Sequence, residues 1–322
     1  MSIVFVGTPE FAVPSLRRIV AGGHAVAAVI TQPDRATGRH RNRLTPPPVK
    51  EAALELGLAV RQPASLRDPV AIAELRALNP EVMIVVAYGQ ILRQEVLDIP
   101  TRGVLNVHAS LLPTYRGAAP IAAAILACDD ETGVSIMLMD AGMDTGPVLS
   151  QRRAAISPHD TRGSLSERLS HLGADLLGET LPRWLAREIE PQPQDNSQAT
   201  VTRLISKGDG TIDWTLPAAD IWRRVRAYNP WPGAYTALAG EQITIWRSWP
   251  LGKSSGQAPG TIIASPTDAP EEARDAAFAV QTGDGLLAVL ELQRAGRRAV
   301  SSAEFARGAP GLLGKRFGTP GK

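Results

Sequence analysis

Short apolar runs alternate with amphipathic stretches along the first half of the chain. The apolar runs lie at residues 3–6, 25–31, 82–87 and 104–108, and their near-continuous hydrophobicity is typical of parallel strands covered on both faces. Between them, apolar residues recur at helical spacing at residues 12–21, 49–56 and 70–78. This alternation predicts an α/β domain built on a doubly wound, mainly parallel sheet.

The alternation of apolar runs and helical patterns continues to about residue 187, and a polar stretch follows it. Beyond residue 108 the pattern predicts a helix at 118–128, strands at 134–139 and 148–156, and a long helix at 164–187. Residues 190–202 are polar and contain almost no apolar side chain, which is typical of an interdomain linker.

The last third of the chain is rich in short strands. Strands are predicted at 242–246, 260–264, 277–282 and 285–293, with a helix at 218–227, and the turn Thr282-Gly283-Asp284-Gly285 predicts a hairpin. Short strands and tight turns over about 110 residues are typical of a small antiparallel barrel of the OB type. We therefore expect an α/β domain at 1–189, a linker at 190–206 and an OB-like β-barrel domain at 207–322.

The composition of the chain and its first residues predict the cellular compartment. The 322-residue chain is 44% hydrophobic and 20% charged, as ordinary globular proteins are. It has no run of about 18 apolar residues and opens on a strand rather than a signal peptide, so we expect neither a membrane span nor secretion. Cys128, the single cysteine, ends an apolar stretch and is expected to pack inside the protein. The cytoplasm is the expected location.

The net charge of +2 hides two basic clusters. Residues 31–50 contain five basic residues and one acidic residue, and residues 281–322 contain seven basic and three acidic residues. The basic residues of the first cluster are Arg35, Arg39, Arg41, Arg43 and Lys50. Such clusters are usually solvated surface, but two of them in a nearly neutral chain favour a partner that bears phosphates.

The stretch Asn106-Val107-His108 and the later Asp144 carry side chains suited to acyl transfer onto an amine. Asn106 and His108 are two positions apart, so an extended strand projects both to one face. An amide can donate to a developing oxyanion, an imidazole can move protons near neutral pH, and a carboxylate can orient that imidazole. Each residue also has an ordinary structural interpretation, since Asp commonly organises turns.

Familiar cofactor sites fit the sequence poorly. The loop at residues 7–11 has one glycine where the dinucleotide fingerprint needs three, although Asp34 could mimic the ribose-binding acid. The Gly-x4-Gly-Lys-Ser/Thr loop of a P-loop nucleotidase does not occur. His108, Asp140 and Asp144 could ligate a metal by residue type, but a second His or Cys is missing from the set. We expect no metal.

Longer motifs resemble those of a known family. They lie at residues 5–12, 31–35, 85–89, 106–121, 132–146 and 228–232. The Asn-x-His-x-Ser-Leu-Leu-Pro…Asp pattern is similar to that of enzymes that use 10-formyltetrahydrofolate. The Gln-Pro-Asp-Arg, Tyr-Arg-Gly-Ala-Ala-Pro-Ile and Asn-Pro-Trp-Pro stretches resemble the tRNA-acting members. Over nearly its whole length the chain resembles the methionyl-tRNA formyltransferases.

The resemblance implies a fold, a reaction and a site. The fold is a formyltransferase domain followed by an OB-like domain, and the reaction moves a formyl group from 10-formyltetrahydrofolate to the α-amino group of methionyl initiator tRNA. Catalysis is assigned to Asn106, His108 and Asp144. The residues implied in folate binding are Ser110, Leu111, Leu112, Pro113, Val86, Tyr88, Gly89, Leu92 and Asp140.

The tRNA side of the resemblance involves basic residues. In the family, the loop that matches residues 34–50 enters the acceptor end of the tRNA, a role that falls here on Arg39. Thr114 stands where the family usually has a basic residue, so Arg116 is the remaining cation there. The residues expected to contact tRNA are Arg39, Arg41, Arg43, Arg116, Arg223 and Arg224. We expect a monomer that binds tRNA and folate and has no membrane partner.

Two other functions remain open on the sequence. One is a folate-dependent formyltransferase that acts on a small amine, such as a nucleotide precursor or an amino sugar. It would need the same three residues, but it would not explain the basic loop or the barrel. The other is an RNA-binding protein whose α/β domain is structural. It would use the basic clusters, but the occurrence of Asn106, His108 and Asp144 together would be a coincidence. Incubation with 10-formyltetrahydrofolate and charged initiator tRNA distinguishes the three.

Overall fold

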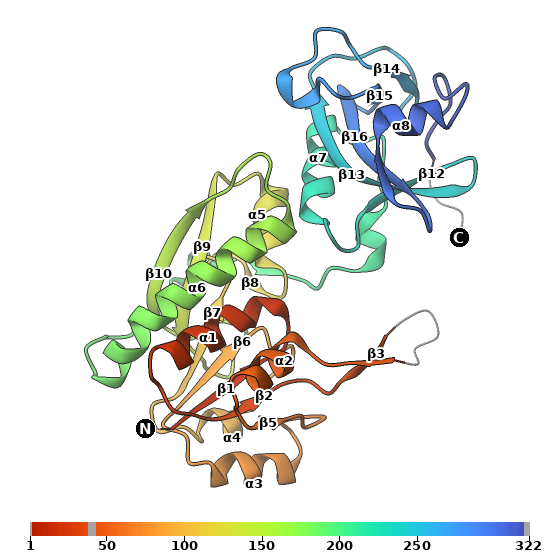
Figure 1. Ribbon diagram of the computed structural model, residues 1–322. Helices are drawn as coiled ribbons and strands as arrows, with labels where there is room; N and C mark the ends of the chain where they lie inside the picture. The colour runs from red at the N-terminus through yellow and green to blue at the C-terminus, as the bar shows by residue number, and fades with distance from the viewer. Residues whose placement is uncertain (1, 38–42, 319–322) are drawn as a thin grey trace. The chain divides into compact units, whose positions relative to one another are not determined.

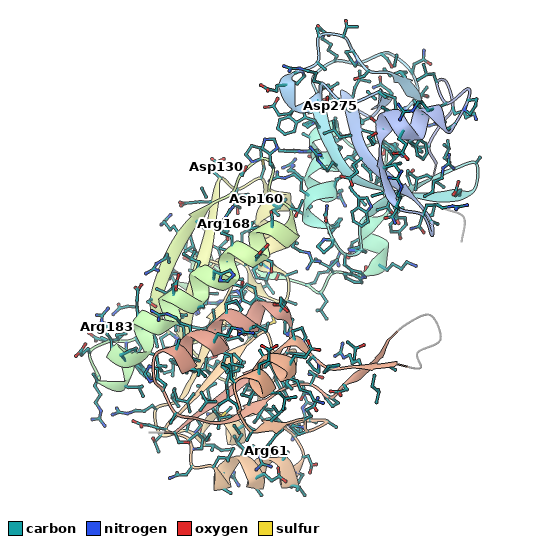
Figure 2. The ribbon with its side chains drawn as sticks, viewed as in Figure 1. Arg61, Asp130, Asp160, Arg168, Arg183 and Asp275 are labelled. Atoms are coloured by element: carbon teal, nitrogen blue, oxygen red, sulfur yellow. The ribbon has the colours of Figure 1, made fainter. Side chains whose placement is uncertain are left out.

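The computed structural model describes residues 2–37 and 43–318 and divides into two compact units (Figure 1). Unit 1 comprises Met1–Pro120, Glu131–Ala155 and Ser166–Arg203. Unit 2 comprises Ile121–Asp130, Ile156–Leu165 and Leu204–Lys322, so the two units interleave along the sequence. Asp160, labelled in Figure 2, lies in one of the two short segments that cluster with unit 2.

Unit 1 is built on a seven-stranded sheet with the order β10-β9-β7-β6-β1-β2-β5. All pairs from β7 to β5 are parallel, and β9 and β10 add an antiparallel edge beside β7. The strands are β1 (Ile3–Gly7), β2 (Val26–Ile30), β5 (Val60–Arg61), β6 (Val82–Val86), β7 (Val104–His108), β9 (Glu131–Leu138) and β10 (Val148–Ala155). The expected doubly wound, mainly parallel sheet is confirmed.

Helices cover both faces of this sheet. On one face, α1 (Val13–Ala21) and α6 (Arg162–Leu185) lie side by side (Figure 1), and Arg18 of α1 reaches Asp175 of α6 with a nitrogen–oxygen distance of 3.7 Å. On the other face, α3 (Pro69–Ala77) buries Ile72 and Leu75 against side chains of β1 and β6. Unit 1 also contains α2 (Pro48–Glu55) and α4 (Gln94–Leu97), whereas α5 (Pro120–Ala127) clusters with unit 2 from its second residue on.

Short pairings that local pattern did not predict complete unit 1. β3 (Arg35–Thr37) and β4 (Arg43–Thr45) form an antiparallel hairpin in the basic stretch, which had been expected to be an irregular loop. β8 (Arg116–Gly117) pairs in parallel with β11 (Val201–Thr202), so the polar segment expected to be a linker returns to the sheet domain.

Unit 2 contains an antiparallel sheet with the order β12-β13-β16-β15-β14, and β17 pairs with β16. The strands are β12 (Ala234–Leu238), β13 (Glu241–Leu251), β14 (Ile262–Ala264), β15 (Phe278–Gln281), β16 (Leu286–Arg294) and β17 (Ala299–Ser301). Gln281 pairs with Leu286 across the predicted hairpin turn. Near the C-terminus, Gly318 bridges Ala237 of β12 and Arg316 bridges Thr261 next to β14, which links the two ends of the sheet. The expected OB-like barrel is confirmed.

The core of unit 2 draws on both sheet and helix. α7 (Ala218–Ala227) buries Ile221 and Val225, and α8 (Ser302–Arg307) buries Phe305, against the inward side chains of the sheet. The expectation for Cys128 was wrong, because this residue follows the last turn of α5 with a positive φ and its side chain is exposed. In the part of the chain that the structure describes, every helix is too short or too polar to cross a membrane.

Candidate active site

Asn106 and His108 are positioned by β7, the strand between the parallel and antiparallel parts of the sheet. Val107 faces α6, where a Cβ on Gly173 would lie 2.8 Å from its Cγ1. Because side chains alternate along a strand, Asn106 and His108 face the opposite side of the sheet. Both side chains are buried, with 8% and 6% of their residue surface exposed, so water has little access to either.

Asp144 is brought to these two residues by the turn that connects β9 to β10. Its Oδ2 lies 3.6 Å from His108 Nδ1, and its Oδ1 lies 3.5 Å from Asn106 Nδ2. The backbone N–H of Gly117 also donates to Asp144 Oδ2 at 2.8 Å. The carboxylate therefore stands between the amide and the imidazole, and the structure brings together the three side chains that the sequence singled out.

The Nε2 edge of the His108 ring contacts the backbone. Nε2 lies 2.9 Å from the carbonyl oxygen of Tyr115, and since a carbonyl only accepts, Nε2 carries a hydrogen in this arrangement. Nδ1 faces the Asp144 carboxylate. The contact with Tyr115 therefore fixes the orientation of the ring and leaves Nδ1, beside Asp144, as the nitrogen that can gain or lose a proton.

The turn after β7 is held by hydrogen bonds to the antiparallel edge of the sheet. Ser135 Oγ donates to the carbonyl of Ser110 at 2.7 Å and accepts from the backbone N–H of Leu112 at 3.0 Å. Gln151 Nε2 donates to the carbonyl of Leu112 at 2.8 Å. Ser110 Oγ donates to the carbonyl of Thr114, so the implied folate-binding turn 110–113 has a defined shape.

The second implied folate-binding segment includes the last residue of β6 and the residues that follow it. Val86, Tyr88 and Leu92 are buried, the last two within the apolar cluster between the sheet and α3, and burial raises the pKa of Tyr88 to about 12. These three side chains expose little surface. Gly89 and Ile91 alternate with them and are exposed, so they and the local backbone are the groups a ligand can reach.

The carboxylate of Asp140 accepts hydrogen bonds from residues of its own turn. Its Oδ1 accepts from the backbone N–H of Gly142 at 3.0 Å and from Thr145 Oγ1 at 2.6 Å. These bonds shape the turn that carries Asp144. In residues 2–37 and 43–318 no three His, Cys, Asp or Glu side chains gather in a way that could hold a metal ion.

Comparison with known proteins decides the family. A Formyl transferase model matches residues 1–181, and a Formyl transferase C-terminal domain model matches residues 204–310. A methionyl-tRNA formyltransferase of Chloroflexus aurantiacus is 49% identical over 96% of this chain and 97% of its own length. Another, of Methylococcus capsulatus, is 47% identical over 99% of this chain and 100% of its own. The chain belongs to the methionyl-tRNA formyltransferase family.

A solved structure agrees with this membership at the level of fold. The N-formyltransferase from Helicobacter canadensis, solved with folinic acid and dTDP-3-aminofucose, superposes with a TM-score of 0.65 at 19% identity. The alignment covers 89% of this chain and 98% of that one. As a member of the methionyl-tRNA formyltransferase family, the protein is a formyl-transferring enzyme.

The structure describes some of the basic residues that are expected to contact tRNA in this formyltransferase. Arg39 and Arg41 lie outside the described residues, and Arg43 begins β4, with its backbone paired to Thr37. Lys50 Nζ makes two 2.8 Å contacts with the carboxylate of Asp34, so one cation of the cluster is neutralised internally. The same pairing occupies Asp34, which removes it as a ribose-binding acid.

Arg116 was expected at the mouth of the formyltransferase site, but only 6% of it is exposed. Its guanidinium donates to Gln194 Oε1 and Asn196 Oδ1 in the polar segment, so it has little surface left for a phosphate. In unit 2, Arg223 pairs with Asp220 one turn earlier on α7, and Arg224 is half-buried. Gln194 and Asn196 were missed by the sequence analysis, because nothing in a polar run distinguishes residues that dock from residues that are solvated.

Proposed function

We propose that this protein transfers the formyl group of 10-formyltetrahydrofolate to the α-amino group of methionine esterified to initiator tRNA, giving N-formylmethionyl-tRNA. The observation that carries the proposal is the buried cluster of Asn106, His108 and Asp144 at the end of β7, in a chain 49% identical to a named methionyl-tRNA formyltransferase. An amide, an imidazole and a carboxylate are the groups that formyl transfer between two amines needs.

The reaction forms a bond between the methionine nitrogen and the formyl carbon and breaks the bond between that carbon and N10 of the folate. The α-amino group has an ordinary pKa of about 8, so a useful fraction is neutral and nucleophilic at physiological pH. Negative charge develops on the formyl oxygen during attack. Asn106 Nδ2 is the proposed donor to that oxygen, and one well-placed donor contributes about 3–4 kcal/mol.

His108 and Asp144 are the proposed route for the proton. The attacking amine must lose a proton and the departing N10 must gain one. Since Nε2–H of His108 is donated to the carbonyl of Tyr115, Nδ1 is the ring nitrogen that can take the proton and return it. Asp144 Oδ2, held by the N–H of Gly117, orients the ring. The transfer needs no covalent enzyme intermediate.

The folate is proposed to bind against the turn 110–113 and the exposed positions after β6. Leu111 and Pro113, in the turn that follows His108, are half-buried apolar residues, and Gly89 and Ile91 offer a backbone and an exposed side chain. A mixed polar and apolar ligand suits such a lining. Because the proposed substrates are a folate and an initiator tRNA, we expect the enzyme to act in the cytoplasm, where translation starts.

The tRNA is proposed to contact the basic hairpin. β3 and β4 carry the segment that contains Arg39 and Arg41, and Arg43 is the first residue of β4. Arginines on a hairpin arm can follow phosphates and exposed bases at a tRNA end without needing a preformed groove. Arg223 and Arg224 on α7 remain candidate contacts in unit 2, with Arg224 the less engaged of the two.

A direct assay tests the proposal. The full chain is incubated with 10-formyltetrahydrofolate and each of three acceptors: methionyl initiator tRNA, methionyl elongator tRNA and a nucleotide-linked amino sugar. Formylation of the initiator species alone is the expected result. Transfer to the amino sugar with none to either tRNA would assign a small-molecule formyltransferase. Binding of tRNA without transfer to any acceptor would leave an RNA-binding protein.

A further inference from the structure

The polar segment after α6 returns to the turn that carries Asp144 and makes specific contacts there. Gln194 Nε2 donates to the carbonyl oxygen of Asp144 at 2.8 Å and to that of Gly146 at 2.6 Å. Gln194 Oε1 accepts from Arg116 Nε at 3.0 Å and from Arg116 Nη2 at 2.8 Å. The side-chain amide therefore uses both of its donors on the turn and both of its acceptor positions on one guanidinium.

Arg116 fixes which way this amide points. Its guanidinium is buried and also donates to Asn196 Oδ1 at 2.8 Å, while its backbone N–H donates to the carbonyl of Thr200 at 2.9 Å. A guanidinium has donors only, so Gln194 must present its oxygen to Arg116 and its nitrogen to the turn. A flipped amide would place two N–H groups against the cation and an oxygen against two carbonyls.

The turn that Gln194 holds has a backbone that needs support. Asp144 has a φ of 53°, in the left-handed region, which a residue with a side chain keeps only where the surrounding structure holds it. Gly146 lies so close to the strand before it that an added Cβ would lie 1.9 Å from the carbonyl of Leu138. The two carbonyls bound by Gln194 thus belong to two residues whose backbone positions are constrained.

We infer that Gln194 is a positioning residue that holds Asp144 in reach of His108 and Asn106, and that Arg116 orients Gln194 for this task. The inference rests on the proposed function. It explains why a polar segment with almost no apolar content docks on unit 1, since its contacts are hydrogen bonds at the catalytic turn. A misplacement of about 1 Å in a catalytic group can lower a rate by about 100-fold, so loss of this support should appear in kcat.

Two substitutions of Gln194 separate its two bonding roles. Gln194→Met keeps the length of the side chain and removes donors and acceptors together. Gln194→Glu keeps the tie to Arg116 but removes both donors, so it places a carboxylate oxygen against two carbonyls. Matched controls are Gln192→Met and Gln192→Glu, two residues earlier, where the exposed side chain donates to the carbonyl of Glu190, away from the catalytic turn.

The expected result is a fall in kcat of about 10- to 100-fold for both Gln194 variants, with KM for folate and for tRNA changed less than about threefold. The Gln192 controls should stay within about twofold of wild type. Gln194→Glu should retain the wild-type Tm more closely than Gln194→Met, because its bond to Arg116 is kept. A kcat within twofold of wild type in both Gln194 variants overturns the inference.

A double-mutant cycle tests whether Gln194 acts through Asp144. If it does, adding Gln194→Met to Asp144→Asn should lower kcat by less than about twofold below Asp144→Asn alone, because the residue being positioned is already impaired. Fully multiplicative losses would show that Gln194 stabilises the domain and does not position Asp144. Wild-type protein is included as a control in every assay. If the wild type does not formylate tRNA, the proposed function is refuted, and this outcome is distinct from a failure of the inference about Gln194.

Discussion

Asn106 and His108 occupy the same face of β7 but have different roles in the proposed reaction. Asn106 Nδ2 donates to Asp144 Oδ1 across a long distance of 3.5 Å, so its amide can turn to a new acceptor at little cost. His108 is held on both sides, by Tyr115 and Asp144. A loosely held donor suits charge that appears only in the transition state, and a firmly held ring suits repeated proton transfer.

Substitution of these two residues should therefore have separable kinetic effects. His108→Ala should lower kcat by about 100-fold or more, because the route for the proton is removed. Asn106→Ala should also lower kcat by about 100-fold but change KM for folate by less than about threefold, since its donor acts on the transition state. Steady-state kinetics at saturating tRNA measure both, with circular dichroism as the control for folding. A His108→Ala variant that keeps more than about a tenth of wild-type kcat would exclude an essential proton carrier, and a pure KM effect would make Asn106 a binding residue.

At the scale of elements, the basic hairpin is anchored by an ion pair at its base. Asp34 lies just before β3 and accepts hydrogen bonds from Gln62 Nε2 at 2.7 Å and from Lys50 Nζ at 2.8 Å. The bond from Gln62, followed by the bond from Lys50, holds the pKa of Asp34 below its ordinary value. Because the folded pKa is lowered, the ionised carboxylate stabilises the fold above the unfolded pKa, and this contribution disappears as the pH falls through the folded pKa.

Asp34→Asn should lower Tm at pH 7, and the difference from wild type should shrink as the pH is lowered below about 4. Thermal melts of both proteins over a pH series measure it. Asp98→Asn is the matched control, since Asp98, directly after α4, accepts an exposed hydrogen bond from Gln94 at the start of that helix. A difference for Asp34→Asn that does not change between pH 7 and pH 3 would contradict the ionic origin of this anchor.

Two glycines of α6 test how closely the helix packs under the catalytic strand. A Cβ on Gly173 would lie 2.8 Å from Val107 Cγ1 and 3.2 Å from Val134 Cγ1, and β-branched side chains in a sheet cannot move aside easily. A Cβ on Gly178 would meet the flexible side chain of Arg18, with its Nε at 2.6 Å. The helix gains about 1 kcal/mol from either Gly→Ala change, whereas overpacking a core costs about 1–3 kcal/mol.

Gly173→Ala should therefore be destabilising by up to about 2 kcal/mol, and Gly178→Ala should be neutral or stabilising by up to about 1 kcal/mol. Urea unfolding of the two variants measures both signs against wild type. Because Val107 separates Asn106 from His108, Gly173→Ala should also lower kcat, whereas Gly178→Ala should not. Equal effects of the two substitutions on stability would mean that α6 can shift away from β7 without cost.

At the scale of the whole molecule, unit 2 is assembled from segments distant in sequence. Arg226 of α7 is 7% exposed and donates from Nε to the carbonyl of Asp160 at 2.8 Å and from Nη2 to that of Ser157 at 2.7 Å. Its guanidinium lies 4.4 Å from the ring centre of Trp222, and burial lowers its pKa. Arg226 thus ties residues 156–165 into unit 2.

Arg226→Met keeps most of the aliphatic volume but removes both hydrogen bonds and the stacked charge. Hydrogen bonds from charged groups contribute about 1.5–3 kcal/mol each, so a loss of about 2–4 kcal/mol and a Tm lower by about 5–10 °C are expected. Arg224→Met, on the same helix, is the matched control and should change Tm by less than about 2 °C. Since the proposed catalytic residues belong to unit 1, kcat below the melting range should change little, and a large loss of kcat without a loss of Tm would count against this account.

The sequence by itself determined what depends on neighbours along the chain. Apolar runs predicted β1, β2, β6 and β7, because a strand buried on both faces needs continuous hydrophobicity. The two-residue spacing predicted that Asn106 and His108 share a face, and the turn 282–285 predicted the hairpin between β15 and β16. Longer motifs carried the resemblance to the family, and through it the three residues of the site.

Only the tertiary structure decided what depends on distant partners. Whether Arg116, Lys50 and Arg226 are free cations or buried structural ones depends on Gln194, Asp34 and Asp160, which lie from 16 to 78 positions away in sequence. The placement of Asp144 beside Asn106, 38 positions earlier, requires β9 to pair antiparallel with β7. A charge pattern or a polar run has the same sequence signature on a solvated surface and in a docked segment, because hydrogen-bonding partners are assigned by the fold and not by local propensity.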